Sequence, residues 1–205
     1  MAGASELILS IKNVSKSFPG VKALDNVSMD IRRGVVHGIV GENGAGKSTL
    51  MKILSGVYSK DSGTVEFDGR IVERTTPIDA LRMGLSIIYQ EFSLVNTMTV
   101  GENIFLGRFR EVGGMKKTHQ KARKLLDSIG SMIDTNSYIS ELSTSEKQMV
   151  EITKALSFDS KLIIMDEPSS SLTDDELKRL GSIIRELKSR GISIIYISHK
   201  LDEIF

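Results

Sequence analysis

The fold of this 205-residue chain is decided by the stretch Gly41-Glu42-Asn43-Gly44-Ala45-Gly46-Lys47-Ser48, which fits the pattern G-x-x-x-x-G-K-[ST]. A short apolar segment, 35–40, precedes this stretch, and a predicted helix, 48–55, follows it. Glycines let backbone N–H groups turn inward around phosphate oxygens, and the helix N-terminus adds unpaired donors. Lys47 would reach the β- and γ-phosphates, and the Ser48 hydroxyl would lie on Mg²⁺. The stretch therefore predicts a phosphate-binding loop.

We expect the bound nucleotide to contact the whole loop and the start of its helix. The predicted contact residues are Gly41, Glu42, Asn43, Gly44, Ala45, Gly46, Lys47, Ser48 and Thr49.

Composition narrows the classes of function. The chain has 40% hydrophobic residues and a net charge of +1, which suits a packed core and gives no overall attraction to nucleic acid or anionic lipid. It has no cysteine, which excludes disulfides and thiolate metal sites. No run of residues approaches the 18 apolar residues of a membrane span, so we expect any link to a membrane to go through a partner. The basic stretch 108–124 has no interleaved aromatic residues for stacking on bases, which favours a solvated helix face over a nucleic-acid site.

Strand and helix patterns alternate through much of the chain. Several of the strand patterns are continuous apolar runs, as expected for strands covered on both faces. The predicted strands are 7–14, 27–31, 35–40, 64–67, 85–89, 162–165 and 193–197, and the predicted helices between them are 48–55, 77–83 and 174–190. This alternation predicts an α/β fold with a mainly parallel sheet.

The middle of the chain has only helical patterns. Capping boxes at Thr99 with Glu102 and at Ser143 with Glu146 mark two helix starts. We therefore expect an α-helical subdomain, residues 91–157, inserted into an α/β core made of residues 1–90 and 158–205.

A second group of polar residues follows predicted strands. Asp166 and Glu167 end the apolar strand 162–165, where Asp166 would hold Mg²⁺ and Glu167 would polarise the attacking water as a general base. His199 closes another strand and is either a contact for the γ-phosphate or an exposed loop histidine. Gln90 either completes the Mg²⁺ shell and orients water or is a surface residue. We expect the turn around Lys47 and the acidic pair to converge on one metal-bound triphosphate.

Taken together, these pieces resemble an ABC-type ATPase domain. The run Leu142-Ser143-Thr144-Ser145-Glu146-Lys147-Gln148 is similar to the signature sequence of that family, Leu-Ser-Gly-Gly-Gln, and precedes the strand with Asp166. More narrowly, the chain resembles the N-terminal ATPase half of bacterial monosaccharide importers of the ribose, galactoside and xylose group. That similarity is carried by residues 18–25, 41–58, 89–92, 99–107, 148–152, 166–173 and 196–204. The resemblance implies a P-loop NTPase (RecA-like) core.

The resemblance also implies roles and partners. Phe18 would stack on adenine, Gln90 would sense Mg²⁺ and couple to the membrane partner, and His199 would be the switch histidine on the γ-phosphate. Ser143 and Ser145 would cap ATP held by a second ABC ATPase domain, either in tandem or in a dimer. The other implied partners are transmembrane permease subunits and, indirectly, a periplasmic or extracellular sugar-binding protein. These partners would place the chain at the cytoplasmic face of the cell membrane.

The chain departs from the family pattern in places. Ser145 stands where the family usually has its second glycine, and Thr173 stands where many members have aspartate. The family's domain continues past the position of Phe205, so we expect a fragment of a longer tandem protein.

Two other classes remain open. One is a soluble ABC-type ATPase of the translation type; the DNA-repair type is disfavoured, because the interval from Gln90 to Ser143 is too short for its coiled-coil insert. The other is a nucleotide-binding module with little turnover in isolation. A GTPase is disfavoured because the chain has no Asn-Lys-x-Asp motif.

Overall fold

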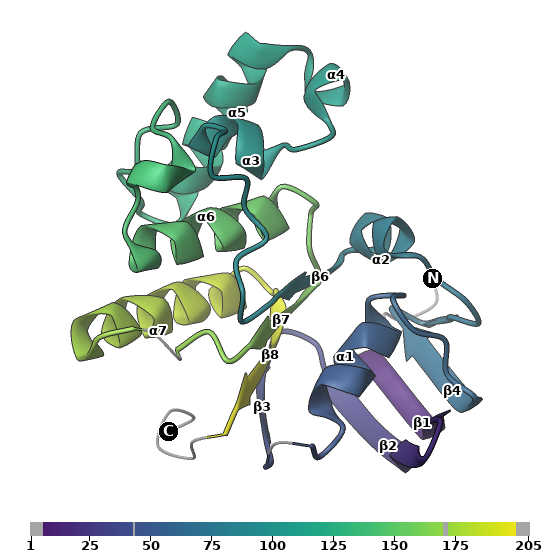
Figure 1. Ribbon diagram of the computed structural model, residues 1–205. Coiled ribbons are helices and arrows are strands. Elements are labelled where there is room, and N and C mark those ends of the chain that lie inside the picture. The colour runs from purple at the N-terminus through teal and green to yellow at the C-terminus, as the bar shows by residue number, and fades with distance from the viewer. Residues whose placement is uncertain (1–5, 43, 170–171, 200–205) are drawn as a thin grey trace.

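The computed structural model describes residues 6–42, 44–169 and 172–199, and its strands form two four-stranded sheets (Figure 1). The first sheet is antiparallel, in the order β2-β1-β4-β5, and the second is parallel, in the order β3-β8-β7-β6. The strands of the first are β1 (Leu7–Phe18), β2 (Val21–Arg32), β4 (Ser62–Phe67) and β5 (Arg70–Ile71). The strands of the second are β3 (Val36–Val40), β6 (Leu85–Ile88), β7 (Leu162–Asp166) and β8 (Ser193–Ser198). The predicted α/β class with a parallel sheet is confirmed.

The antiparallel sheet is a feature that the strand patterns did not indicate. Its strands β1 and β2 are longer than the predicted segments, because they continue to a tight hairpin in which Phe18 pairs with Val21. The hairpin ends, residues 15–18 and 21–26, mix polar and apolar residues without an apolar run and are mostly exposed, so only the other halves of the two strands had a strand pattern. Gly20, at φ 80°, supplies the left-handed conformation that this turn needs.

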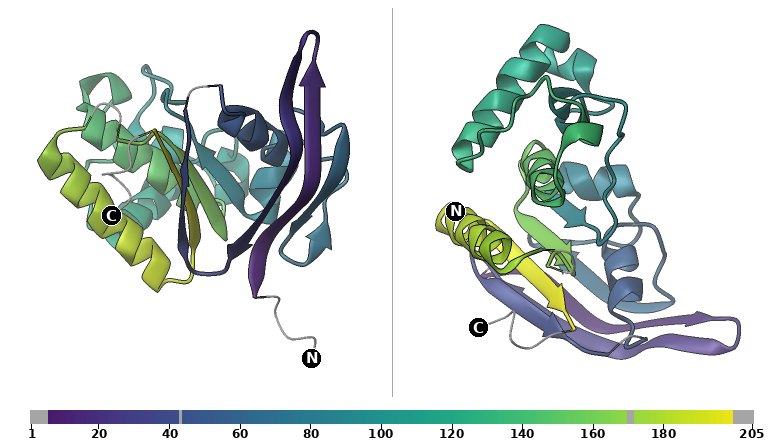
Figure 2. Two further views of the ribbon diagram at one scale, coloured as in Figure 1. Left: turned by 90° about the horizontal axis from the view of Figure 1, so that it is seen from below. Right: turned by 60° about the vertical axis from the view of Figure 1, so that its left-hand side comes forward.

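The parallel sheet is covered on both faces, and the side chains of its strands alternate between two apolar clusters (Figure 2). On β7, Leu162 and Ile164 pack in the cluster of helix α1 (Lys47–Leu54) and the antiparallel sheet. Ile163 and Met165 pack in the cluster of helix α7 (Asp174–Ser189) and the end of helix α6 (Thr144–Leu156). All four side chains are fully buried, and each such burial stabilises the fold by about 1.5–3 kcal/mol. Strand β7 is therefore held rigidly in the middle of the core.

Between β6 and β7 the chain forms a group of helices, drawn teal to green at the top of Figure 1. They are α3 (Val100–Ile104), α4 (Phe109–Val112), α5 (Met115–Ser128), the 3₁₀ helix η1 (Ile139–Glu141) and α6. They share an apolar cluster of their own, which includes Ile104, Leu126 and Val150. In the described part of this segment the only β pairing is one isolated bridge between Thr99 and Tyr138. The helical character of the segment matches the expectation, while its division from the core at residues 90 and 158 stays a prediction.

The helices α2 (Pro77–Met83), α3 and α6 each begin with a side-chain cap. Thr76 caps α2, Thr99 caps α3 and Ser143 caps α6, each in a capping box with the acidic residue three positions on. In the described part of the chain, no helix is long and apolar enough to cross a membrane.

Candidate functional site

The carboxyl ends of the parallel strands bring the predicted site residues to one edge of the sheet. In the ladder, Val40 pairs with Ser198, Asp166 pairs with Ile197, and Ile88 pairs with Met165. The phosphate loop follows β3, His199 follows β8, Glu167 follows β7, and Gln90 lies two residues after β6. In open α/β sheets ligands bind beyond this edge, so the topology assembles a site from segments far apart in the sequence.

The loop after β3 has a backbone that glycine alone adopts without strain. Gly44 and Gly46 have φ values of 86° and 84°. A Cβ on Gly46 would also lie 2.5 Å from the carbonyl oxygen of Ala23, which is far inside van der Waals contact. The Ala45 N–H donates to the carbonyl of Glu42 at 3.2 Å and closes the turn. Asn43, which the sequence placed among the nucleotide contacts, lies outside the described residues.

The first turn of α1 is left without a capping side chain. Its N-cap is Gly46, and it has no acidic residue in the first turn, in contrast to α2, α3 and α6. The backbone N–H groups there and the positive end of the helix dipole therefore suit a bound anion. Lys47 begins this helix, and its ammonium donates to the carbonyl oxygens of Gly41 and, at 2.9 Å, of Glu42. The lysine thus lies across the loop, with Ser48 and Thr49 in the same turn, and this arrangement fits the phosphates of a nucleotide.

The acidic pair faces the same space as α1. Burial raises the pKa of Asp166, the neighbouring charge of Glu167 raises it further, and the ammonium groups of Lys47 and Lys52 oppose both effects. Two lysines of α1 therefore act electrostatically on the carboxylate that ends β7. Lys52 is a member of this group that the sequence did not single out.

Glu167 is held in an unusual conformation beside His199. Its φ is 47°, in the left-handed region, and its backbone N–H donates to the carbonyl of Ile197 at 3.0 Å. The Glu167 side chain is 15% exposed, and its Oε1 lies 3.1 Å from Nδ1 of His199. His199 thus has a carboxylate partner at the site, which favours the functional interpretation over that of an isolated loop histidine.

The oxygen donors at this edge suit a magnesium ion. Mg²⁺ takes hard oxygen ligands and is commonly bound by one or two protein groups together with substrate phosphates and water. Asp166 offers a carboxylate and Ser48 a hydroxyl on the first turn of α1, while Gln90 lies exposed two residues beyond β6. The donors present therefore fit the ion, with Asp166 as the charged ligand.

Replacing Asp166 with asparagine is expected to raise the melting temperature of the nucleotide-free protein at neutral pH, while weakening Mg²⁺-dependent ATP binding. The pKa of Asp166 is raised in the folded state, so the folded state holds the proton more tightly than the unfolded state does. Stability then falls as pH rises from the ordinary aspartate pKa to the raised one, and the cost persists at higher pH.

The neutral amide removes that cost, so the variant should melt a few degrees higher. Thermal unfolding of both proteins should show the gap closing as pH falls toward about 4. A lower melting temperature for D166N at neutral pH would contradict the assignment of a desolvated carboxylate.

Phe18 lies at the end of β1 and is 36% exposed. Its ring packs edge-on against Tyr58 with centroids 5.2 Å apart, and Lys16 Nζ lies 5.5 Å from its centroid. The ring is thus fixed by neighbours and still accessible to solvent, as stacking on a base would require.

The predicted signature residues lie on the helical segment. The Ser143 hydroxyl donates to Glu146 Oε2 at 2.7 Å. The pKa of Glu176 on α7 is lowered, first by a hydrogen bond from the Thr173 backbone and then by a hydrogen bond from the Ser145 side chain. Among the described residues, neither serine forms a hydrogen bond with the phosphate loop. Glu146 is a further departure, which the sequence analysis did not include: it places a carboxylate where the signature Leu-Ser-Gly-Gly-Gln has a neutral glutamine.

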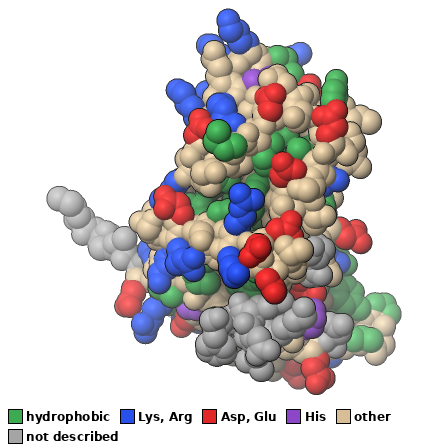
Figure 3. All heavy atoms as spheres, turned by 90° about the vertical axis from the view of Figure 1, so that its left-hand side faces the viewer, with side chains coloured by type: hydrophobic (Ala, Val, Ile, Leu, Met, Phe, Trp, Pro, Cys, Tyr) green, Lys and Arg blue, Asp and Glu red, His purple; other side chains and the backbone are tan. Residues whose placement is uncertain are grey.

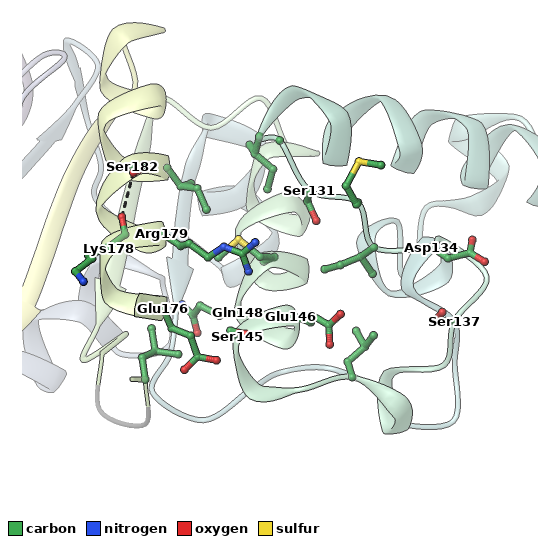
Figure 4. Close-up of a pocket in the computed structure, with 18 residues that line it drawn as sticks. Ser131, Asp134, Ser137, Ser145, Glu146, Gln148, Glu176, Lys178, Arg179 and Ser182 are labelled. Carbon is green, nitrogen blue, oxygen red and sulfur yellow. Dashed lines mark hydrogen bonds between the residues drawn. The ribbon is translucent and has the colours of Figure 1, made fainter. Parts of the chain in front are cut away.

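A cavity of about 580 Å³ separates the start of α6 from α7 (Figure 4). Ser145 and Glu176 lie on its walls, and Arg179 extends from α7 into it. Figure 3 looks onto this side of the molecule and shows hydrophobic side chains surrounded by Lys, Arg, Asp and Glu side chains. The helical segment and the core are therefore loosely packed against each other here.

Comparisons with known proteins identify close relatives. Residues 24–170 match the family model described as ABC transporter. The chain is 49% identical over 203 residues to the galactose/methyl galactoside import ATP-binding protein MglA of Sodalis glossinidius, and 45% identical over 205 residues to MglA of Escherichia coli K12. Each match covers 98% of this chain and 40% of the relative, so the chain spans about 40% of the length of these curated relatives.

Solved structures have the same fold. A nucleotide-free ATP-binding cassette from an ABC transporter matches with a TM-score of 0.86 at 29% identity, over 97% of this chain and 83% of that one. An ATP-binding cassette of an ABC transporter in its ADP conformation matches with a TM-score of 0.85 at 30% identity, with the same coverage.

Proposed function

Because this chain belongs to the ABC transporter family, we propose that it binds and hydrolyses ATP with Mg²⁺ and so powers uptake of a monosaccharide through a membrane permease. One observation carries the proposal: the phosphate loop with Lys47 follows β3 and the acidic pair 166–167 ends β7, and the carboxyl ends of these strands lie at the same edge of the parallel sheet. The residues proposed to bind phosphate and those proposed to activate water thus lie at one edge of one sheet.

The phosphates are held by backbone and by Lys47. Backbone N–H groups of the loop and of the first turn of α1 donate to phosphate oxygens, and Lys47 exchanges the carbonyls of its own loop for the β- and γ-phosphates. Ser48, Asp166 and Gln90 would hold Mg²⁺, whose contribution would be to neutralise charge on the β- and γ-phosphates. Phe18 would stack on the adenine ring.

Glu167 acts as the general base for hydrolysis. It accepts a proton from the attacking water as the water oxygen bonds to the γ-phosphorus, and the bond from that phosphorus to the bridging oxygen breaks to release ADP. His199 Nδ1, 3.1 Å from Oε1, orients the carboxylate, which leaves Nε2 of the imidazole for the γ-phosphate. Gln90 orients the water.

The second nucleotide contact comes from another ABC ATPase domain, in tandem or in a dimer. Ser143 is exposed at the start of α6, and its hydroxyl and the first-turn N–H groups can face a phosphate across an interface.

The partner in the membrane is a permease. A groove of about 280 Å³ lies beside the segment that carries Gln90, between α2, β6 and α6, and has a largely apolar lining that includes Leu81, Leu106 and Phe158. A permease segment seated there would touch the residues next to Gln90, on the cytoplasmic face of the membrane. The names of the MglA relatives support a monosaccharide as the cargo, which a periplasmic or extracellular binding protein would present to the permease. Nucleic acid is not a proposed partner.

A nucleotide-binding module with little turnover is the second candidate, and Glu146 favours it. Its carboxylate lies in the first turn of α6, where a phosphate of a facing domain would approach, and like charges there weaken closure.

Assembly with the permease in lipid vesicles tests the proposed function. We expect ATP-dependent phosphate release, and stimulation of that release by a sugar-loaded binding protein, only in vesicles that contain the permease. Vesicles without permease are the control. ATP binding without phosphate release would favour the second candidate, and co-sedimentation with ribosomes in place of the permease would contradict transport.

A further inference from the structure

The backbone just after Gln90 is hydrogen-bonded to helix α6 through one buried carboxylate. Glu151 is only 5% exposed, and its Oε1 accepts from the N–H of Ser93 at 2.6 Å and from its hydroxyl at 2.9 Å. Lys154, one turn further on, donates to the carbonyl of Ser93 at 2.9 Å. The N–H, hydroxyl and carbonyl of one residue are thus all bound by α6, which makes Ser93 a fixed point on that helix.

The chain that follows is fastened to the helical segment a second time. Asn103 of α3 is fully buried, and its Oδ1 accepts from the N–H of Val95 at 2.8 Å. Its Nδ2 lies 3.1 Å from the carbonyl oxygen of Val95 and 3.0 Å from that of Thr99. Both ends of the segment 93–99 are therefore hydrogen-bonded to the helices α6 and α3.

Gln90 lies on a short linker between these hydrogen-bonded residues and the sheet. Strand β6 ends at Ile88, and the next fixed residue is Ser93. In the described structure, Gln90, Glu91 and Phe92 lie outside any helix or strand, and Gln90 is exposed. A displacement of α6 against the sheet would be taken up in residues 89–92, so the position of Gln90 depends on where α6 holds Ser93.

Helix α6 links the Glu151–Ser93 contact to the surface proposed to face a partner domain. Ser143 begins the helix, and Glu151 lies eight residues on, which is a rise of about 12 Å along a rigid helix. A push on Ser143 therefore moves Glu151, and with it Ser93.

We propose that Glu151 is a positioning residue that couples α6 to Gln90, so that closure of the facing ATPase domain onto Ser143 brings Gln90 into place for hydrolysis. This inference rests on the proposed function. Glu151 touches neither nucleotide nor water in this role; it acts through Ser93. The same residues, Ser93, Glu151 and Lys154, line the groove proposed for the permease, so a docked permease segment would bear on this fastening.

Three variants of the full-length protein, assembled with its permease, test the coupling. E151L removes the acceptor at similar volume. E151Q keeps one oxygen for the N–H and hydroxyl of Ser93, and its amide can donate to that hydroxyl. T153V is the matched control, because Thr153 is fully buried on the same helix and its hydroxyl donates to the carbonyl of Met149 within α6.

The expected pattern separates positioning from folding. E151L should keep its ATP dissociation constant within about twofold while kcat falls at least about tenfold, since a small misplacement of a catalytic group costs one to two powers of ten. Hydrogen exchange at the Ser93 amide should accelerate to match. E151Q should recover most of the kcat, and T153V should behave as the unmodified protein.

Normal kcat in E151L would overturn the proposal, as would an equal loss in E151L and T153V. Failure of the unmodified protein to hydrolyse ATP would instead refute the proposed function, and this role of Glu151 with it. An unchanged rate of hydrogen exchange at the Ser93 amide in E151L would show that Glu151 does not hold Ser93 on α6, and would also overturn the proposal.

Discussion

Replacing Glu167 with glutamine is expected to lower ATP turnover about a thousandfold and to leave ATP affinity within about threefold, because a general base contributes two to four powers of ten and little to binding. The amide has the shape of the carboxylate and keeps an oxygen facing His199, but it cannot accept a proton from water. The phosphate-binding groups lie on the loop after β3 and on α1, so the substitution leaves them in place.

Phosphate release and ATP binding should be measured on the same preparation of E167Q. Asp175→Asn is the matched control, because it neutralises an exposed carboxylate on α7 whose described partner is Lys178. Unchanged hydrolysis in E167Q would remove Glu167 from the catalytic role. Loss of ATP binding as well would show that Glu167 also holds the phosphate-binding edge together.

Replacing Lys47 with alanine is expected to weaken ATP binding about a hundredfold, since each hydrogen bond to a charged group contributes about 1.5–3 kcal/mol and Lys47 would make at least one to the phosphates. The loss also removes a cation that favours ionisation of Asp166, so the pKa of that metal ligand should rise further and oppose Mg²⁺ binding. Calorimetric titration with ATP in the presence of Mg²⁺ gives the affinity.

Lys52→Ala is the matched control for Lys47→Ala. Lys52 also acts on Asp166, but its ammonium lies over the ring of Tyr58, 5.4 Å from the centroid, and not across the loop. We therefore expect a much smaller loss of affinity in K52A. An ATP affinity in K47A equal to that of the unmodified protein would contradict the phosphate-loop assignment.

Local sequence rules predicted the parts of the fold that local physics determines. The apolar runs of β7 and β8 follow from burial on both faces, and the capping boxes at Thr99 and Ser143 follow from hydrogen bonds within one turn. The expectation that Lys47, Asp166 and Glu167 lie at one edge of the sheet rested on the tendency of ligands to bind beyond the ends of parallel strands, whereas the strand order β3-β8-β7-β6 was not predicted.

Features that depend on distant partners were not predicted. The outer halves of β1 and β2 are strands because they pair with each other at the hairpin, and their mixture of polar and apolar residues gave no pattern of burial. Lys52 lies five residues after Lys47, a spacing that marks no common helix face, and its relation to Asp166 appears only when β7 is placed beside α1. The fastening of Ser93 by Glu151 joins residues 58 positions apart.

The two acids at the end of β7 oppose thermal stability to the catalysis proposed for them. Asp166 loses hydration where it lies, and Glu167 holds a backbone angle that glycine would adopt more cheaply. A laboratory selection for thermal stability alone would therefore favour the loss of both carboxylates, which are the groups proposed to bind Mg²⁺ and to activate water.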